Sequence, residues 1–310
     1  MKKISVLVPT YNEKDNIADF VSDIEQIFSD ELHNYNYEIV IIDNNSNDGT
    51  KNIIEELCSK NSNIKAIFNI RNFGSIRSGF YGLLQTSGDC VVKIAADFQE
   101  PIDMIPKMVS AWEDGSHVVI GIKSSSAENK LKYKTRNLYY SIIKRCSEIE
   151  QIEGFTGFGL YDKSFIDTLR QLDDPLPYFR GLVSEYGGKR TEILYDQPAR
   201  KNGESKYRLK ALYDYAMLGF TSYTKSFLRS ATFVSGLLFF VSLILTIILV
   251  VASFNAVSAT NLLIIAAICC MFFISGIMTF FIGMLGEYVL SINTRTLNRP
   301  LVAEEKRINF

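Results

Sequence analysis

The stretch Ala95-Ala96-Asp97-Phe98-Gln99-Glu100-Pro101 is the most informative part of this chain for its fold. It follows a mostly apolar run over residues 91–94 and places two acids and an amide just before a proline. This pattern is typical of a buried parallel strand whose carboxyl end delivers oxygen ligands to a cleft. On an extended backbone the side chains of Asp97 and Gln99 leave the same face, where a hard cation could sit between them and phosphate oxygens. The alternative is a strand end with a solvated acidic turn.

Strands and helices are predicted to alternate through the first part of the chain. We expect strands at residues 4–9, 38–42, 64–68, 91–94 and 118–121. We expect helices over residues 16–28, from residue 53 onward, and over 75–85. The alternation predicts an α/β fold with a mostly parallel sheet covered by helices on both faces. The loops at the carboxyl ends of such strands share one crevice. Their polar residues are Tyr11, Glu13, Asp43, Asn72 and Asp97.

Composition narrows the chemistry of this crevice. Lys plus Arg is 33 against 34 for Asp plus Glu, so no global charge indicates a nucleic-acid partner. The sequence has neither a glycine-rich dinucleotide fingerprint after the first strand nor a Walker loop. Two histidines cannot form a three-histidine zinc site within one chain, and the cysteines have no CxxC spacing. Any metal must therefore be held mainly by oxygen atoms, which favours Mg²⁺ or Mn²⁺.

The sequence of the C-terminal third predicts a membrane anchor. Residues 230–286 carry no charged side chain. This uncharged segment is long enough for two helical crossings of a bilayer. We expect a span over about 231–254, a turn near 255–261 and a second span to about 286. Lysines and arginines flank this hairpin on both sides and are missing from its turn, so both ends are expected in the cytoplasm. The N-terminal apolar run is too short for a signal peptide, so we expect a multi-pass protein of the inner (cytoplasmic) membrane with its catalytic domain and both termini in the cytoplasm.

Four motifs together resemble a known family. They are Val8-Pro9-Thr10-Tyr11-Asn12-Glu13, the loop over residues 43–50, Arg71-Asn72-Phe73-Gly74, and Asp97 to Pro101. Their order and spacing are similar to those of family 2 glycosyltransferases with a GT-A fold. The chain resembles most the polyprenyl-phosphate glycosyltransferases, the group of dolichol-phosphate mannose synthase and the bactoprenol glucosyltransferases. The resemblance extends to residues 200–207, 286–288 and 299–301.

The resemblance implies a role for each matching residue. The residues implied to hold the nucleotide sugar are Pro9, Tyr11, Glu13, Ile41, Asp43, Asn44, Ala96, Asp97 and Lys123. Asp97 and Gln99 are implied as the metal ligands, for Mg²⁺ or Mn²⁺. The residues implied to bind the diphosphate and the acceptor phosphate are Lys123, Arg136, Arg200 and Lys206. For the basic loop residues the alternative is a solvated loop without a ligand.

The chain departs from the family pattern at three places. Ala95 stands where the family usually has an acid, so a ligand or orienting group is lost there. Asn44 replaces the second aspartate of its loop, and Gly157 replaces an acid in the acceptor region. A polyprenyl phosphate is already an anion near neutral pH and needs no base to attack the sugar. A hydroxyl acceptor would need one, and Glu185 is the candidate, with an exposed surface acid as the alternative.

These features lead to one principal interpretation and two alternatives. The first is a membrane-anchored, metal-dependent, inverting glycosyltransferase that moves a hexose, from UDP in our interpretation, to polyprenyl (undecaprenyl) phosphate for cell-surface glycan modification. Its expected partners are the nucleotide-sugar donor, the polyprenyl phosphate, the lipid bilayer and further copies of the chain. The alternatives are a family 2 enzyme with a hydroxyl acceptor and an inactive anchor protein that keeps the fold. The expected units are a donor half (1–125), an acceptor half (126–208), amphipathic juxtamembrane helices (209–229), two transmembrane helices (230–286) and a cytoplasmic tail (287–310).

Overall fold

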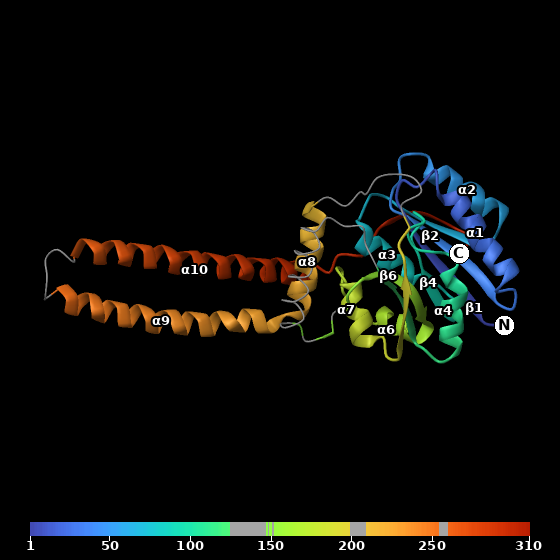
Figure 1. The fold of residues 1–310 in the computed structure, drawn as a ribbon. Coiled ribbons are helices and arrows are strands. Elements are labelled where there is room, and N and C mark those ends of the chain that lie inside the picture. The colour runs from blue at the N-terminus through green and yellow to red at the C-terminus, as the bar shows by residue number, and fades with distance from the viewer. Residues whose placement is uncertain (125–146, 148, 151, 199–208, 254–259) are drawn as a thin grey trace.

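The structure, a computed structural model, describes residues 1–124, 147, 149–150, 152–198, 209–253 and 260–310 (Figure 1). Its strands are β1 (Lys3–Thr10), β2 (Asn36–Asp43), β3 (Ile64–Asn69), β4 (Cys90–Lys93), β5 (Val118–Lys123), β6 (Phe155–Asp162), β7 (Arg190–Tyr195) and β8 (Glu304–Ile308). Its helices are α1 (Ile17–Asp30), α2 (Thr50–Lys60), α3 (Ser75–Leu84), α4 (Met104–Glu113), α6 (Lys163–Arg170), α7 (Phe179–Tyr186), α8 (Leu209–Tyr223), α9 (Lys225–Ser253) and α10 (Thr260–Thr296). Every strand and helix expected within the first 125 residues is confirmed to within a few positions.

All strands belong to one eight-stranded sheet in the order β7-β5-β6-β4-β1-β2-β3-β8. Within it β1 pairs in parallel with β2 and β4, β2 with β3, and β5 with β7. Among the strands that the structure describes, only β6 and β8 run antiparallel to their neighbours. The expected α/β fold with a mostly parallel sheet is therefore confirmed. Strands β6 and β7 of the expected acceptor half belong to the same sheet as the strands of the expected donor half.

Helices cover both faces of the sheet, as buried parallel strands require. One core lies between the sheet and α1, α2 and α4, and its buried side chains include Phe20, Ile54 and Met108. The other lies between the sheet and α3, α6 and α7, and includes Phe80 and Phe165. Alternate residues of each central strand point into opposite cores. The β-branched apolar runs of β1 and β2 suit this position because both of their faces are buried.

The C-terminus returns to the sheet instead of forming a free tail. Helix α10 continues past the expected boundary at residue 286 to Thr296, and β8 then adds to β3 as an antiparallel edge strand. Asn69, the last residue of β3, pairs with Glu304, the first residue of β8. The chain leaving α10 therefore joins the sheet at the edge where the parallel strands end. Tyr81 on α3 donates a hydrogen bond to the Glu304 carboxylate at 2.7 Å and helps to hold the strand there.

Helices α9 and α10 extend away from the sheet as an antiparallel pair, with α8 between them and the α/β unit (Figure 1). Within the described residues, one stretch of α10, Phe273–Thr296, is long and apolar enough to cross a membrane. None of that stretch is buried inside the protein. The base of α10 is fastened to the rest of the chain, because Arg295 forms an ion pair with Asp174 at 3.3 Å and bonds to Ser222 at 3.0 Å. The first expected span, at about 231–254, coincides with α9 up to Ser253 and stays a prediction.

The opposite edge of the sheet, where the parallel strands begin, is held by a buried carboxylate. The side chain of Glu38 on β2 is 1% exposed and forms ion pairs with Lys3 at 2.7 Å and Lys65 at 2.9 Å. The Ser5 hydroxyl and the Ser87 backbone N–H also donate to it, at 2.6 and 2.7 Å. Burial acts to raise the pKa of Glu38, but these donors outweigh it and lower the pKa to about 2. Ionised Glu38 thus ties β2 to β1, β3 and the loop before β4.

We expect Glu38→Gln to destabilise the protein by about 3 kcal/mol at pH 7, because a pKa lowered by two units or more corresponds to about that free energy. A depressed pKa stabilises the fold above the ordinary value of 4.5, and this stability is lost as the pH falls towards about 2. Denaturant unfolding of the full chain in detergent, followed by the fluorescence of Trp112, measures the difference. The matched control is Glu56→Gln, which removes an exposed i,i+4 pair with Lys60 and should change nothing measurable. Equal stability of the two variants at pH 7 would contradict this account.

Candidate functional site

The loops that follow β1 and β2 are fastened to one another. The Asn12 backbone N–H donates to the Ser46 hydroxyl at 2.8 Å, and the Asn47 N–H donates to the Asn12 side-chain oxygen at 2.9 Å. The Glu13 N–H donates to the Thr50 hydroxyl at 3.0 Å. Asn12 has a φ of 55°, a left-handed conformation that asparagine tolerates better than most residues. The two loops expected to share a crevice therefore form one connected rim at the carboxyl ends of the strands.

Asp43 closes β2 beneath this rim. It is fully buried, and Ser46 donates to both of its carboxylate oxygens, through the backbone N–H at 2.9 Å and through the hydroxyl. Burial raises the pKa of Asp43, and the Ser46 hydrogen bonds act against that rise. In this arrangement the carboxylate fixes the turn that carries Ser46. Its expected contact with the nucleoside stays a prediction.

Asn44 connects β2 to the segment after β3. Its side-chain N–H donates to the Asn72 oxygen at 3.0 Å. Its side-chain oxygen accepts from Asn69 at 3.2 Å and from the Phe73 backbone N–H at 2.9 Å. An aspartate at this position could accept these hydrogen bonds but could not donate one to Asn72. The asparagine that replaces the family's aspartate at position 44 therefore makes a hydrogen bond to Asn72 that an aspartate could not make.

The other expected donor-side residues differ in exposure. Tyr11 and Pro9 are half-buried on the rim, as a residue that stacks on a base would need to be. Glu13 is also half-buried, and its carboxylate accepts a hydrogen bond from the Asn16 side chain at 2.7 Å. Ile41 is fully buried in the core, where its side chain packs against apolar neighbours. The structure thus gives Ile41 a packing role, and its expected nucleotide contact stays a prediction.

The backbone at Asp97 differs from the extended strand end expected from the sequence. β4 already ends at Lys93, and residues 96–97 lie in a turn. Phe98 has a φ of 59°, and the Gln99 N–H donates to the Asp97 carboxylate at 3.2 Å. The backbone between Asp97 and Gln99 is therefore not extended, so the expectation that both side chains leave one face of an extended strand was wrong. Both residues still lie at the carboxyl edge of the sheet.

The residues at this turn fit a hard cation only in part. Asp97 offers a carboxylate and Gln99 an amide oxygen, the ligand types that Mg²⁺ and Mn²⁺ accept. In the part of the chain that the structure describes, no group of three or more histidine, cysteine, aspartate or glutamate side chains is placed to hold a metal. A divalent cation here would need further oxygen ligands, and the phosphates of a nucleotide are the natural source.

Sequence reasoning gave no role to two charged residues at this edge, Lys93 and Glu100. The Glu100 carboxylate accepts from the Ala95 backbone N–H at 2.8 Å and from the Thr156 hydroxyl at 3.0 Å. Burial raises the pKa of Glu100 to about 7, and the charge of Asp97 adds to this rise. Perturbed carboxylates of this kind are concentrated at functional sites. Two features of the sequence could have pointed to these residues: Lys93 is a lysine within an otherwise apolar strand, and Glu100 is an acid directly before a proline.

The remaining expected site residues are spread more widely. Lys123 is the last residue of β5, and its backbone N–H donates to the Gly154 carbonyl at 3.2 Å. Glu185 is exposed on α7, where it accepts a hydrogen bond from Tyr223 of α8 at 3.1 Å. This contact favours a packing role for Glu185 over a base. Arg136, Arg200 and Lys206 lie outside the described residues, so their roles stay predictions.

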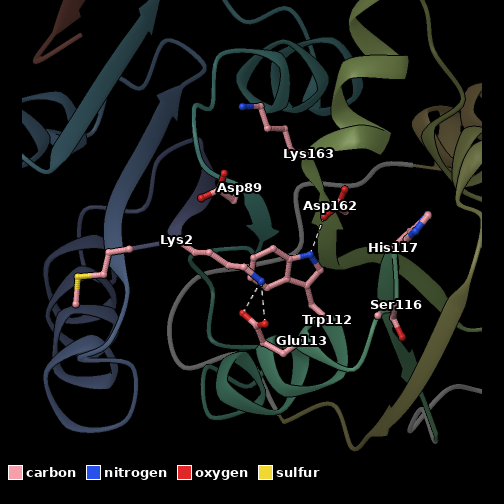
Figure 2. Close-up of a pocket in the computed structure, with 10 residues that line it drawn as sticks. Lys2, Asp89, Trp112, Glu113, Ser116, His117, Asp162 and Lys163 are labelled. Atoms are coloured by element: carbon pink, nitrogen blue, oxygen red, sulfur yellow. Dashed lines mark hydrogen bonds and ion pairs between the residues drawn. The ribbon is translucent and has the colours of Figure 1, made fainter.

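A polar hollow lies at the opposite edge of the sheet, and Figure 2 shows its lining. There Lys2 pairs with Glu113 at 2.8 Å and lies 4.4 Å from the ring centre of Trp112. The Trp112 indole N–H donates to Asp162 at 2.7 Å. None of the expected site residues is among those lining this hollow. Its charges are largely satisfied internally, so we place the candidate site at the carboxyl edge.

The chain is similar over nearly its full length to named glycosyl transferases. Bactoprenol glucosyl transferase of Shigella phage SfX is 29% identical over 302 residues, which cover 96% of this chain and 97% of that protein. The prophage bactoprenol glucosyl transferase homolog of Escherichia coli (strain K12) has the same identity and coverage. Among solved structures, glucosyl-3-phosphoglycerate synthase from Mycobacterium tuberculosis is 17% identical with a TM-score of 0.48, covering 71% of this chain and 79% of that chain.

The family model described as Glycosyl transferase family 2 matches residues 5–170. The match covers more than half of the chain and includes β1 to β4, β6 and the loops that carry the expected donor-side residues. It also includes Lys93, Asp97 and Glu100, so the polar carboxyl edge lies within the family domain. This chain belongs to glycosyl transferase family 2.

Proposed function

We propose that this family 2 glycosyltransferase moves a hexose from a uridine diphosphate sugar to polyprenyl phosphate at the cytoplasmic face of the membrane. The observation that carries the proposal is the similarity, over 96% of the chain, to proteins named bactoprenol glucosyl transferases. The match therefore includes the apolar C-terminal helices as well as the family domain. The position of β8 supports the same proposal, because the chain leaving α10 joins the sheet at the carboxyl edge.

In this proposal the acceptor phosphate attacks the anomeric carbon opposite the leaving diphosphate and inverts the configuration. Because the acceptor is already an anion, the site needs no base and must instead position two phosphate-bearing partners. Asp97 and Gln99 would hold the divalent cation, with Ala96 beside them. When bound, Mg²⁺ or Mn²⁺ would offset negative charge on the leaving diphosphate. The rim formed by residues 9–13 and 43–50 would hold the nucleoside, and Lys123 would lie near the phosphates.

Asp97→Asn is expected to lower transfer by about 100-fold or more, because it removes the charged ligand of the proposed cation. Glu185→Gln should lower it less than about threefold, because Glu185 is exposed and bonds to Tyr223. The measurement uses membranes that contain the enzyme, labelled UDP-sugars and undecaprenyl phosphate. A mild-acid-labile lipid product that is lost on chelation of divalent ions supports the proposal.

Other outcomes of the same assay would favour the alternative functions. A product formed only on hydroxyl lipids, together with an inactive Glu185→Gln enzyme that still binds nucleotide, would indicate a hydroxyl acceptor and a base at Glu185. Absence of turnover with every UDP-sugar and GDP-sugar would favour an inactive anchor protein.

A second test addresses the donor side through Asn44. Asn44→Asp removes the N–H donated to Asn72 and places a carboxylate against the Asn72 oxygen. We expect the KM for the nucleotide sugar to rise about tenfold, since one hydrogen bond is replaced by a repulsive contact. The KM for undecaprenyl phosphate should stay within about twofold, because Asn44 lies on the β2 side of the sheet. A change in the acceptor KM alone would contradict the assignment of this rim to the donor.

The membrane arrangement also belongs to this proposal. We propose that α9 and α10 both span the membrane, with the turn at 255–261 on the far side and both termini in the cytoplasm. The antiparallel course of α9 and α10 supports this, as do the basic residues that flank the uncharged segment. Reporter fusions inserted in the turn and at the C-terminus measure the topology. Reporters active on the same side would contradict it, and chemical crosslinking in membranes tests the expected homo-oligomer.

A further inference from the structure

The Lys93 side chain has an unusual environment for a lysine. It projects from the end of β4, and its ammonium lies 4.5 Å from the ring centre of Phe179 on α7. No hydrogen-bond acceptor is recorded for this ammonium among the described residues. A lysine that is partly withdrawn from solvent in this way is costly unless an anion or an aromatic face compensates its charge. The Phe179 ring supplies only part of that compensation.

Gly157 of β6 lies beside this ammonium and carries no side chain. Gly157 has a φ of 102°, a conformation that favours glycine, and its carbonyl accepts from the Tyr161 hydroxyl at 2.9 Å. A Cβ atom at this position would lie 3.3 Å from the Lys93 ammonium and 3.8 Å from the Phe179 ring. The backbone of β6 therefore approaches the lysine closely without a side chain to cover it.

Two charged side chains act on the Lys93 ammonium. Burial lowers the pKa of Lys93 to about 8, Glu100 acts to raise it, and Arg180 acts to lower it further. The Glu100 carboxylate is turned to the Ala95 N–H and the Thr156 hydroxyl, and no ion pair joins it to Lys93 among the described residues. The Lys93 ammonium thus has no acidic partner among the described residues, and an added anion would favour its charged form.

The surroundings of Lys93 connect the sheet edge to the juxtamembrane helix. Phe179 and Arg180 begin α7, and the Arg180 guanidinium lies 5.1 Å from the ring centre of Tyr215 on α8. Tyr178 also packs on Tyr215, with the ring centres 5.5 Å apart. On the other side, the Lys93 stem would lie 3.8 Å from a Cβ at Gly79, which adjoins Pro9 of the expected donor rim. Lys93 thus lies between the donor side and the helix that leads to the apolar segment.

We infer that Lys93, with Arg180 beside it, forms a cationic subsite that binds the phosphate of the prenyl phosphate acceptor. The inference rests on the proposed function and assigns to that site a group that positions the attacking phosphate. Because residue 157 is glycine, no β6 side chain at this position lies against the ammonium, and α7 and α8 supply the side from which a lipid tail would approach.

Steady-state kinetics of the full chain in detergent or membranes test this subsite. We expect Lys93→Gln to raise the KM for undecaprenyl phosphate about tenfold or more, because a charge-assisted hydrogen bond is lost. The KM for the UDP-sugar should stay within about twofold, and Lys93→Arg should restore most of the acceptor affinity because it restores the positive charge. The matched control is Lys163→Gln, at the opposite edge of the sheet, which should leave both constants unchanged. Thermal unfolding of each variant reports whether it folds.

Direct binding separates this subsite from the proposed function. Farnesyl phosphate, farnesol and UDP are titrated into the wild type, Lys93→Gln and Lys93→Arg. Farnesyl phosphate should bind about tenfold more weakly to folded Lys93→Gln, while farnesol and UDP should bind as they do to the wild type. A loss confined to UDP would assign Lys93 to the donor diphosphate and overturn the inference, as would unchanged binding of all three. If the wild type does not glycosylate undecaprenyl phosphate but farnesyl phosphate binding depends on Lys93, the proposed function fails and the phosphate subsite stands.

Discussion

The pairing of β4 determines where the chemistry of this protein can occur. This short strand lies between β1, with which it is parallel, and β6, with which it is antiparallel. Its carboxyl end therefore lies beside the end of β1 and the beginning of β6. Neighbouring strands are about 4.8 Å apart, so Lys93 is held close to residues on both sides. The ladder of β4 thereby joins the side expected to bind the donor to the side expected to bind the acceptor.

Charged side chains have different partners and different pKa shifts at the two edges of the sheet. At the amino edge the buried carboxylate of Glu38 has two lysine partners and further donors, and its pKa is lowered to about 2. At the carboxyl edge Glu100 has a pKa raised to about 7, and the pKa of Lys93 is lowered to about 8. Glu38 is paired with cations, whereas Glu100 accepts hydrogen bonds only from neutral donors and Lys93 has no ion pair among the described residues. This contrast is an independent reason to place the site at the carboxyl edge.

The sequence predicted the strands whose pattern reflects burial and missed those that depend on tertiary pairing. β1 and β2 are continuous apolar runs because both faces are covered. β8 is rich in charged residues, and its pairing with β3 holds it in the sheet, so no hydrophobic pattern marks it. β6 carries two glycines and lies in a region of irregular pattern. The turn at Asp97 was missed for a related reason, since Phe98 packs edge-on against Phe20 of α1, a contact distant in sequence.

The same distinction applies to the candidate site. The motifs at Asp43 and Asp97 were visible because short polar loops after apolar strands are local features of the sequence. The environment of Lys93 was not visible, because it combines a strand end, a glycine on β6 and an aromatic ring on α7 that meet only in the folded chain. The Asn44 network likewise depends on side chains from β3 and from the loop after it. Chemistry built from a single loop is predictable from sequence, whereas chemistry shared among elements requires the fold.

Two connections place the apolar helices on the side of the site. Residues 297–303 separate α10 from β8 and can span at most about 25 Å, and β8 starts beside the carboxyl end of β3. The end of α10 is therefore close to the carboxyl edge of the sheet. The second connection is the contact between Tyr178, the residue before α7, and Tyr223 of α8, whose ring centres are 6.0 Å apart. Helix α7 also contacts β6, so the two connections reach the sheet on either side of β4 and β1. In the proposed function, a lipid phosphate that emerges near α8 would approach the part of the carboxyl edge that includes Lys93.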